Sequence, residues 1–202
     1  MLSIDPEEQT ERENYKLLIG SIIPRPIAFI TTKSSDGIIN AAPFSYFNIA
    51  ATDPPMLAVS IQRKDGTRKD SARNIINTKE FVIHIVDEDN VAEINKTAAS
   101  LPPNKSEIDV TKLNLAGSTD VAVPAVEQAK VRFECTLEKA IELGRDDITT
   151  ADLIIGKVDR FHIAEDVYEA GKINYGKLKA VSRLAGHDYA TIGNIFSIER
   201  PV

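Results

Sequence analysis

Alternating apolar and polar positions predict that strands dominate this chain. The segments 27–32 and 56–62 are rich in β-branched and aromatic residues, as expected of strands. The segment 81–86 is apolar at nearly every position, which predicts a strand buried on both faces. Farther along, 131–143 and 153–163 alternate apolar with polar side chains and predict two longer strands.

Turn residues place these strands next to one another. Ser35-Asp36-Gly37 is a hairpin signal, and 40–49 is expected to return as the second strand, interrupted at Pro43 because proline has no N–H to donate. Residues 144–150 join the two long strands. No regular helical crossovers separate the strands, so we expect an antiparallel barrel or sandwich decorated by helices, and not a doubly wound parallel sheet.

Two helix-start signals lie near the N-terminus. Asp5 precedes Pro6, as in a cap followed by a first-turn proline, and Thr10 with Glu13 matches a capping box. Either signal can begin a helix that ends at Gly20.

Further short helices are expected between the strands. The segment 69–78 predicts one after the polar, glycine-containing loop 63–68, with Asp70 as its cap. Another follows Asp89, and the two prolines after Leu101 end it. Residues beyond these prolines, up to about 124, follow no regular pattern and predict a long surface excursion.

Composition then narrows the class of protein. With 202 residues we expect a single domain, with a core over about 15–170 and a C-terminal extension over 171–202. The net charge of −6 argues against a general nucleic-acid binder, because phosphate contacts need a clustered positive field. One cysteine, no signal-peptide pattern and no long apolar run predict a cytoplasmic protein without a membrane span.

The sequence lacks several motifs that mark common cofactor-binding and catalytic sites. No GxGxxG fingerprint, phosphate-binding P-loop or GxSxG elbow occurs, which argues against a Rossmann dinucleotide domain and a serine hydrolase. The histidines His84, His162 and His187 are far apart and show no metal-ligand spacing. We interpret His84 as a packed core residue, His162 as a solvated strand end and Cys135 as a small buried residue.

Motifs that follow one another along the chain resemble the flavin reductase-like family, in its flavoredoxin-like branch. They are Ile23-Pro-Arg-Pro-Ile-Ala-Phe-Ile-Thr-Thr, Asn40-Ala-Ala-Pro-Phe-Ser-Tyr-Phe-Asn48 before Asp53-Pro-Pro, Arg68-Lys-Asp-Ser-Ala-Arg-Asn-Ile75, and Arg183-Leu-Ala-Gly-His-Asp-Tyr189. The resemblance implies a mostly β, FMN-binding split β-barrel with peripheral helices. It also implies about six or seven strands and a homodimer.

This resemblance assigns a flavin site to two segments. The ring region comprises Asn40, Ala41, Ala42, Pro43, Phe44, Ser45, Phe47 and Asn48, whose small and aromatic side chains suit a flat ring. The phosphate region comprises Ser60, Arg63, Arg68, Lys69, Ser71 and Asn74, around a helix start that suits an anion. Without the family pattern, an edge strand with ordinary core aromatics and a solvated basic loop explain the same residues.

The catalytic residues are left open. His187 and Tyr189 are candidates near the flavin or a nicotinamide entrance, but a surface turn explains them equally well. Hydride transfer to a flavin needs no obligatory protein acid or base, because the cofactors carry the chemistry.

The resemblance predicts an oxidoreductase that binds FMN, or FAD, and uses NADH or NADPH. Electrons would pass to free flavin or another acceptor, and reduced flavin handed to a partner monooxygenase is one version. A non-enzymatic electron carrier or flavin store is the alternative. A more distant one is a haem-handling protein, for which only His187 is a plausible axial ligand.

Overall fold

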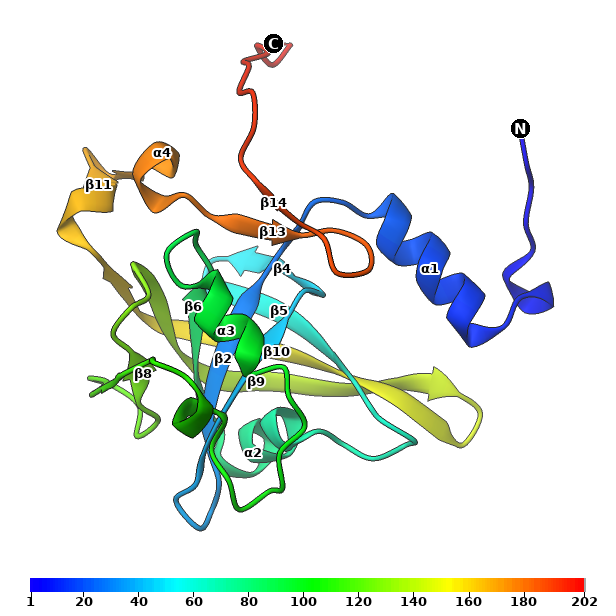
Figure 1. The fold of residues 1–202 in the computed structure, drawn as a ribbon, viewed down its shortest axis with the longest axis horizontal. Helices are drawn as coiled ribbons and strands as arrows, with labels where there is room; N and C mark the ends of the chain where they lie inside the picture. Colours follow the sequence, from blue (N-terminus) through cyan, green and yellow to red (C-terminus); the bar gives the residue numbers. More distant parts are fainter. Residues whose placement is uncertain (202) are drawn as a thin grey trace.

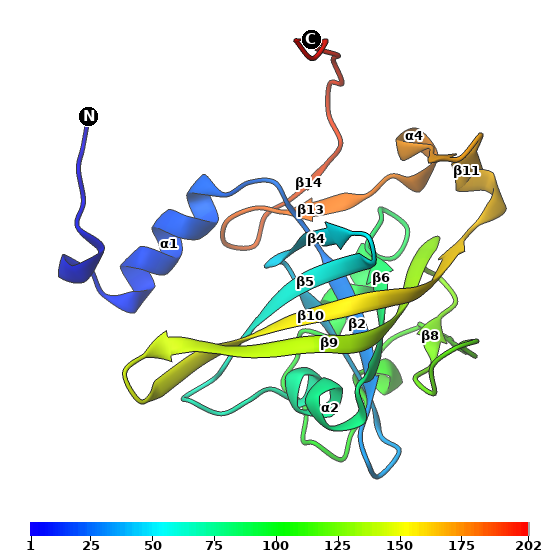
Figure 2. The same ribbon diagram turned by 180° about the vertical axis from the view of Figure 1, so that it is seen from behind.

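The computed structural model describes residues 1–201 as a curved antiparallel sheet with short helices around it (Figures 1 and 2). The helices are α1 (Glu11–Ser21), α2 (Asp70–Thr78), α3 (Val91–Lys96) and α4 (Tyr175–Leu178), with 3-10 turns at Pro6–Glu8, Glu107–Val110 and Glu165–Val167. The strands are β1 (Arg25–Pro26), β2 (Ala28–Lys33), β3 (Ile39–Phe44), β4 (Phe47–Thr52), β5 (Pro55–Gln62), β6 (Glu80–Ile85), β7 (Leu115–Ala116), β8 (Ala125–Val126), β9 (Val131–Arg145), β10 (Ile148–Ile163), β11 (Tyr168–Glu169), β12 (Lys172–Ile173), β13 (Val181–Arg183) and β14 (Tyr189–Thr191).

Seven strands form the main sheet, in the order β3-β2-β6-β9-β10-β5-β4. The expected count of six or seven strands, the antiparallel pairing and the mostly β fold are thereby confirmed. The long strands β9 and β10 pair through three register shifts, and such bulges bend strands so that a sheet can curl around its own core. A separate three-stranded sheet, β1-β13-β14, joins the C-terminal segment to the residues that follow α1.

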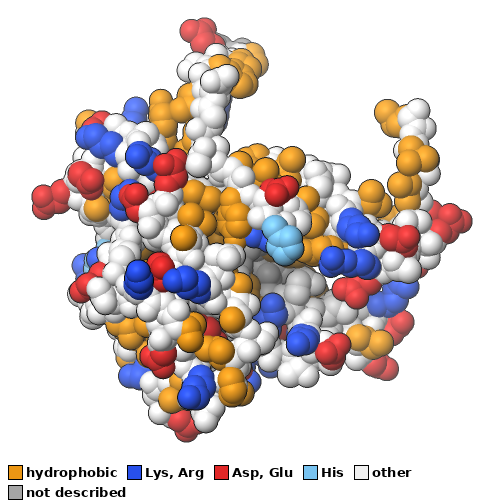
Figure 3. Space-filling view, in the orientation of Figure 1, with side chains coloured by type: hydrophobic (Ala, Val, Ile, Leu, Met, Phe, Trp, Pro, Cys, Tyr) orange, Lys and Arg blue, Asp and Glu red, His pale blue; other side chains and the backbone are white. Residues whose placement is uncertain are grey.

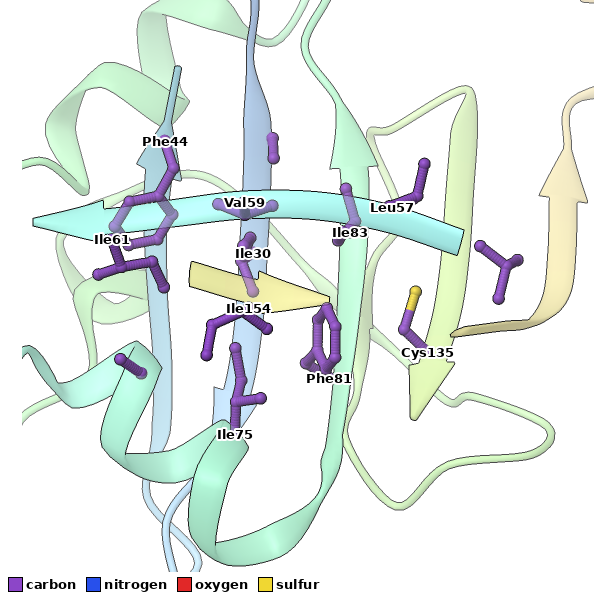
Figure 4. Close-up of a cluster of buried hydrophobic side chains, with 13 residues drawn as sticks. Ile30, Phe44, Leu57, Val59, Ile61, Ile75, Phe81, Ile83, Cys135 and Ile154 are labelled. Atoms are coloured by element: carbon purple, nitrogen blue, oxygen red, sulfur yellow. The ribbon is translucent and has the colours of Figure 1, made fainter. Parts of the chain in front are cut away.

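The largest core cluster lies between the two halves of this curled sheet (Figure 4). Ile30 of β2, Val59 of β5, Phe81 of β6 and Ile154 of β10 are almost completely buried in it. Ile75 adds the buried face of α2, which closes the lower end of the cluster. Strand β6 is buried at its four central positions, as its continuous apolar sequence predicts.

Strand β3 differs from the expectation at Pro43. The proline lies inside the strand, paired with Phe29, and the chain breaks later, at Ser45 and Tyr46, before β4 begins. The reason is that β3 is an edge strand of the main sheet. Ala41, two residues earlier and therefore oriented the same way, donates its N–H away from the sheet, so a proline at 43 costs no sheet hydrogen bond.

Both helix-start signals near the N-terminus are used. Asp5 accepts a hydrogen bond from the N–H of Glu7 and caps the 3-10 turn, while Thr10 and Glu13 form a capping box that begins α1. Helix α1 ends at Ser21, one residue beyond the expected Gly20.

Other element boundaries also differ from the sequence predictions. Lys69, not Asp70, is the N-cap of α2, and Asp70 is its first residue, paired with Arg73. The long strands continue to Arg145 and from Ile148, so the expected 144–150 connector is only a tight turn in which Asp146 has a φ of 52°.

Both ends of the chain leave the body of the molecule. Helix α1 projects to one side, and residues 192–201 extend away after β14 (Figures 1 and 2). None of the helices within residues 1–201 is long and apolar enough to cross a membrane.

Candidate functional site

Two cavities lie beside the segment that joins β3 to β4. The first, of about 430 Å³, is bounded by β3, the loop before α2, the start of α2 and residues 97–101. The second, of about 390 Å³, lies between the end of α1, residues 45–48 and the strands β5 and β10. In Figure 3 the face is hollowed near its centre, with Lys and Arg side chains beside the hollow and hydrophobic ones above it.

Most predicted flavin residues line one of these cavities. Those in the first cavity are Asn40, Ala42, Pro43, Phe44, Arg68, Lys69 and Ser71. Those in the second are Ser45, Phe47, Asn48 and Ser60. The fold therefore brings the two predicted segments together, with consecutive residues Phe44 and Ser45 facing different cavities.

The start of α2 forms one end of the first cavity. The N-cap residue Lys69 makes no side-chain capping bond, and the backbone N–H groups of Asp70, Ser71 and Ala72 donate to no group within residues 1–201. Such amides carry partial positive charge along the helix axis. This end of the cavity is consequently suited to an anion.

Lys69 adds a cation at the same place. Its ammonium lies 5.9 Å from the centre of the Phe44 ring, and no carboxylate of the described chain lies within ion-pair distance. Burial, together with the nearby charge of Lys64, lowers the pKa of Lys69. An anion bound beside it would relieve this desolvation of the charged amine.

Asn40 and Ser71 connect the strand to the helix. The Asn40 side-chain amide donates to Oγ of Ser71 over 2.7 Å, and both residues are buried. This bond fixes the start of α2 against β3, so the uncapped amides and the apolar wall at Ala42, Pro43 and Phe44 keep a constant spacing.

The two arginines are held by carboxylates. Arg63 makes a bidentate pair with buried Asp152, at 2.8 and 3.0 Å, and lies outside both cavities. Arg68 contacts Asp152 at 3.1 Å and also Glu142, while its side chain still borders the first cavity. These ion pairs tie the loop before α2 to strands β9 and β10. A hydrogen bond from Thr149, together with the arginines, lowers the pKa of Glu142, and the arginines lower the pKa of Asp152 despite its burial.

Four further predicted residues lie outside both cavities. Ala41 is fully buried in a second core cluster, and Asn74 is buried with its amide donating to Thr32 over 3.1 Å. Tyr189 donates to Asn95 and packs under a guanidinium, whereas His187 is exposed in the turn after β13.

The second cavity is mainly apolar and contains one buried cation, Arg25. This guanidinium donates to the carbonyls of Ile19, Ile22 and Leu184, which ties the end of α1 to the turn after β13. A cation beside the last carbonyls of a helix is favourable, and it positions α1 beside the cavity.

Sequence reasoning missed Glu107 and the residues 97–101. They line the first cavity, and two of them, Leu101 and Glu107, belong to the irregular segment 101–124, for which the sequence left open whether it covers a site or only decorates the surface. Glu107 is only 6% exposed, and its carboxylate accepts the N–H of Ala41 over 3.0 Å. No sequence signal marks it, because its neighbours in space come from β3 and α2.

The other titratable candidates are structural. His84 is buried, with Nε2 accepting from the N–H of Val126 and Nδ1 donating to the carbonyl of Phe29, as the core interpretation predicts. Cys135 is buried as expected, which raises the pKa of its thiol. His162 differs from the expected solvated position, because it is partly buried against the fully buried Glu134. No cluster of metal-binding side chains occurs among residues 1–201.

Comparison with known proteins identifies the family. The model of the flavin reductase like domain matches residues 19–181, which is most of the chain. The chain belongs to the flavin reductase-like family. The expected family and its split-barrel fold are therefore confirmed, and this membership indicates an oxidoreductase that works with a flavin.

Relatives of this flavin reductase-like protein match it along its whole length. YwrF of Bacillus subtilis (strain 168) is 48% identical over 204 residues, covering 100% of both chains. The crystal structure of nitrilotriacetate monooxygenase component B from Bacillus cereus is 56% identical, with a TM-score of 0.96 and 98% of each chain covered. The 2-nitrobenzoate 2-nitroreductase NbaA of Pseudomonas fluorescens is 27% identical, with a TM-score of 0.88 over 99% of this chain and 96% of that one.

Proposed function

We propose that this protein is an NADH- or NADPH-dependent flavin reductase that binds FMN in the first cavity. The observation that carries the proposal is the uncapped start of α2 beside Lys69, facing the apolar wall of β3. An anion site and an apolar wall in one cavity match a molecule with a phosphate at one end and a flat ring at the other.

The residues present fit such a ligand. The N–H groups of Asp70 and Ser71 and the ammonium of Lys69 supply donors for a phosphate. Ala42 and Pro43 leave room beside the backbone of β3, and Phe44 offers an aromatic face. FAD is a second candidate ligand, because the cavity is partly open to solvent and a larger molecule can extend out of it.

Bound flavin would supply the redox chemistry, accepting a hydride equivalent from a nicotinamide and passing electrons on. The role of the chain is to hold the ring and exclude water from one side of it. Neither His84 nor Cys135 serves as a proton donor at the site, because both are buried in the core away from the two cavities.

The electron acceptor we propose is free flavin or a partner monooxygenase. Support comes from the similarity to nitrilotriacetate monooxygenase component B, whose name describes one part of a larger monooxygenase system. A two-component arrangement needs the reduced flavin to leave, which an open, solvent-facing cavity permits.

We further propose that the protein acts as a homodimer. Helix α1 and the segment after it expose Leu18, Ile22 and Ile23, and the C-terminal tail exposes Phe196 and Ile198, which are 80% and 81% exposed. Apolar side chains gathered on two projecting segments favour burial against another surface.

The test of the proposed activity is an anaerobic titration of the purified protein. We expect a flavin absorbance spectrum after incubation with FMN, and fast bleaching of that spectrum with NADH or NADPH. A bound flavin that resists both nicotinamides but bleaches with dithionite would favour the electron carrier or flavin store. Failure to take up FMN or FAD would overturn the proposal, and a Soret band in its place would point to haem.

A further inference from the structure

Glu107 is an acidic residue in the wall of a cavity that we assign to an anion. Its side chain is 6% exposed and belongs to the 3-10 turn that packs against β3. Oε2 accepts the N–H of Ala41 over 3.0 Å, and no Lys, Arg or His of the described chain lies within ion-pair distance of the carboxylate. A buried carboxylate that accepts only backbone N–H groups and pairs with no cation is poorly compensated in such a position.

The charged groups around the same cavity do not neutralise Glu107. They are Lys64, Asp65, Arg68, Lys69 and Asp70, and β3, on which its turn packs, contributes none. Arg68 is already paired with Asp152 and Glu142, and Asp70 is paired with Arg73. Burial is the main cause that raises the pKa of Glu107, and the nearby charge of Asp70 raises it further.

A phosphate at the start of α2 adds further negative charge to the cavity that Glu107 lines. Like charges in a partly desolvated space repel one another, and protonation of the carboxyl group removes the repulsion. Oε2 keeps the N–H of Ala41, so Oε1 is the oxygen that can carry the proton.

We propose that Glu107 takes up a proton when a phosphorylated flavin binds, and so makes the affinity for the phosphate-bearing form dependent on pH. The inference rests on the proposed function, because it assumes that FMN occupies the first cavity. Glu107 acts here on affinity and specificity. With Glu107 protonated the site binds FMN well, and with Glu107 ionised it favours riboflavin, which has no phosphate.

The sign of the effect follows from linkage. Because the bound phosphate stabilises the protonated form, the pKa of Glu107 is higher in the complex than in the free protein. Affinity for FMN is therefore greatest at low pH and falls as the pH rises through the two pKa values. The FMN phosphate loses its second proton at about pH 6, which also changes affinity, but this contribution is the same for every variant.

The test compares wild type with Glu107→Gln, which keeps an oxygen acceptor for the N–H of Ala41 but cannot ionise. Calorimetric titrations with FMN and with riboflavin in buffers of different ionisation enthalpy give both affinity and proton uptake. We expect wild type to lose about tenfold in FMN affinity relative to Glu107→Gln as the pH rises. We also expect proton uptake with FMN to be greater in wild type, and riboflavin to show no such difference.

Two controls separate the possible outcomes. Glu127→Gln removes an exposed carboxylate that does not line the first cavity, and it should behave as wild type. Riboflavin binding by Glu107→Gln verifies that this variant is folded. If FMN binds but wild type and Glu107→Gln take up equal numbers of protons, the role proposed for Glu107 is wrong, whereas the proposed flavin site is still supported. If FMN binds to neither at any pH, the proposed function fails, and the role of Glu107 fails with it.

Discussion

Cations near the candidate site differ in what already neutralises them, and this difference separates structural from binding residues. Arg63 and Arg68 both pair with the buried carboxylate of Asp152, so their positive charge is already compensated by the protein itself. Lys69 has an aromatic neighbour but, among residues 1–201, no carboxylate within ion-pair distance. Removing one partner of a buried ion pair lowers stability, because the other charge stays buried without compensation. Removing a partly buried lysine that has no such partner instead removes the cost of desolvating its charge.

Lys69→Ala should therefore weaken FMN binding without lowering stability. A charged contact to phosphate contributes about 1.5–3 kcal/mol, so we expect FMN affinity to fall about 10- to 100-fold and riboflavin affinity to change little. Fluorescence titration of both flavins measures this. Lys139→Ala, at an exposed position of β9, is the matched control, and an equal loss for both flavins would argue against a phosphate contact at Lys69.

His84 should make stability depend on pH in the mildly acidic range. Burial lowers its pKa to about 4 in the folded protein, against 6.5 for an unperturbed histidine. Below about pH 6.5 the unfolded chain binds a proton that the folded protein does not, so stability falls as the pH drops toward about 4, by up to about 3 kcal/mol.

Denaturant unfolding at several pH values tests this. His84→Gln can still donate and accept a hydrogen bond, and it should flatten the pH dependence even if its stability is lower throughout. His187→Gln, at the exposed turn, should leave the wild-type slope intact. An unchanged slope in His84→Gln would assign the acid sensitivity to other groups.

Among the elements, the contact of β10 with β6 depends on the absence of a side chain. A Cβ at Gly156 would lie 2.2 Å from the Phe81 ring, whereas one at Gly117 meets nothing within 4 Å. Gly156 also lies next to one of the register shifts between β9 and β10. The bend of the long strands and the position of the buried Phe81 ring are thus coupled.

Gly156→Ala should destabilise the fold by about 1–3 kcal/mol, as expected of an overpacked core. Thermal unfolding should show a lower melting temperature for this variant and little change for Gly117→Ala. Combining Gly156→Ala with Phe81→Leu should recover part of the loss, because the shorter side chain makes room for the new methyl group. Strict additivity of the two changes would mean that the ring is not what Gly156 accommodates.

At the scale of the whole molecule, helix α1 with the residues after it and the C-terminal residues 192–201 expose large apolar side chains to solvent. Helix α1 is tied to the body by Arg25 and by its buried residue Ile19, and the 3-10 turn before it by a contact between Glu7 and Arg145. Leu18 and Ile22 are more than half exposed although they border the second cavity. A second copy that covers them would also complete this cavity.

Wild type should elute as a dimer in size-exclusion chromatography with light scattering. Combined Leu18→Asp and Ile22→Asp substitutions should shift it toward monomer, because charges in an apolar contact are costly to desolvate. Val110→Asp changes a half-exposed apolar residue on the 3-10 turn Glu107–Val110 and serves as the control. A monomeric wild type would contradict the homodimer, and a dimeric double variant would place the interface away from α1.

The amino-acid sequence by itself determined the class of fold and the order of its elements. The continuous apolar run of β6, the alternation in β9 and β10, and the capping residues of α1 are local patterns, and local patterns dictate local structure. The same holds for the family motifs, which led to the two segments proposed to bind flavin. The seven-stranded sheet agrees with them.

Tertiary structure decided which side chains meet. It placed Pro43 on an edge strand, where its missing N–H does no harm, and it paired Arg63 with Asp152, which lies far along the chain. It also brought Glu107 into the same cavity as Lys69. These outcomes depend on burial and on charges from distant segments, which no local pattern encodes, and so the chemistry of the site became visible only once the chain was folded.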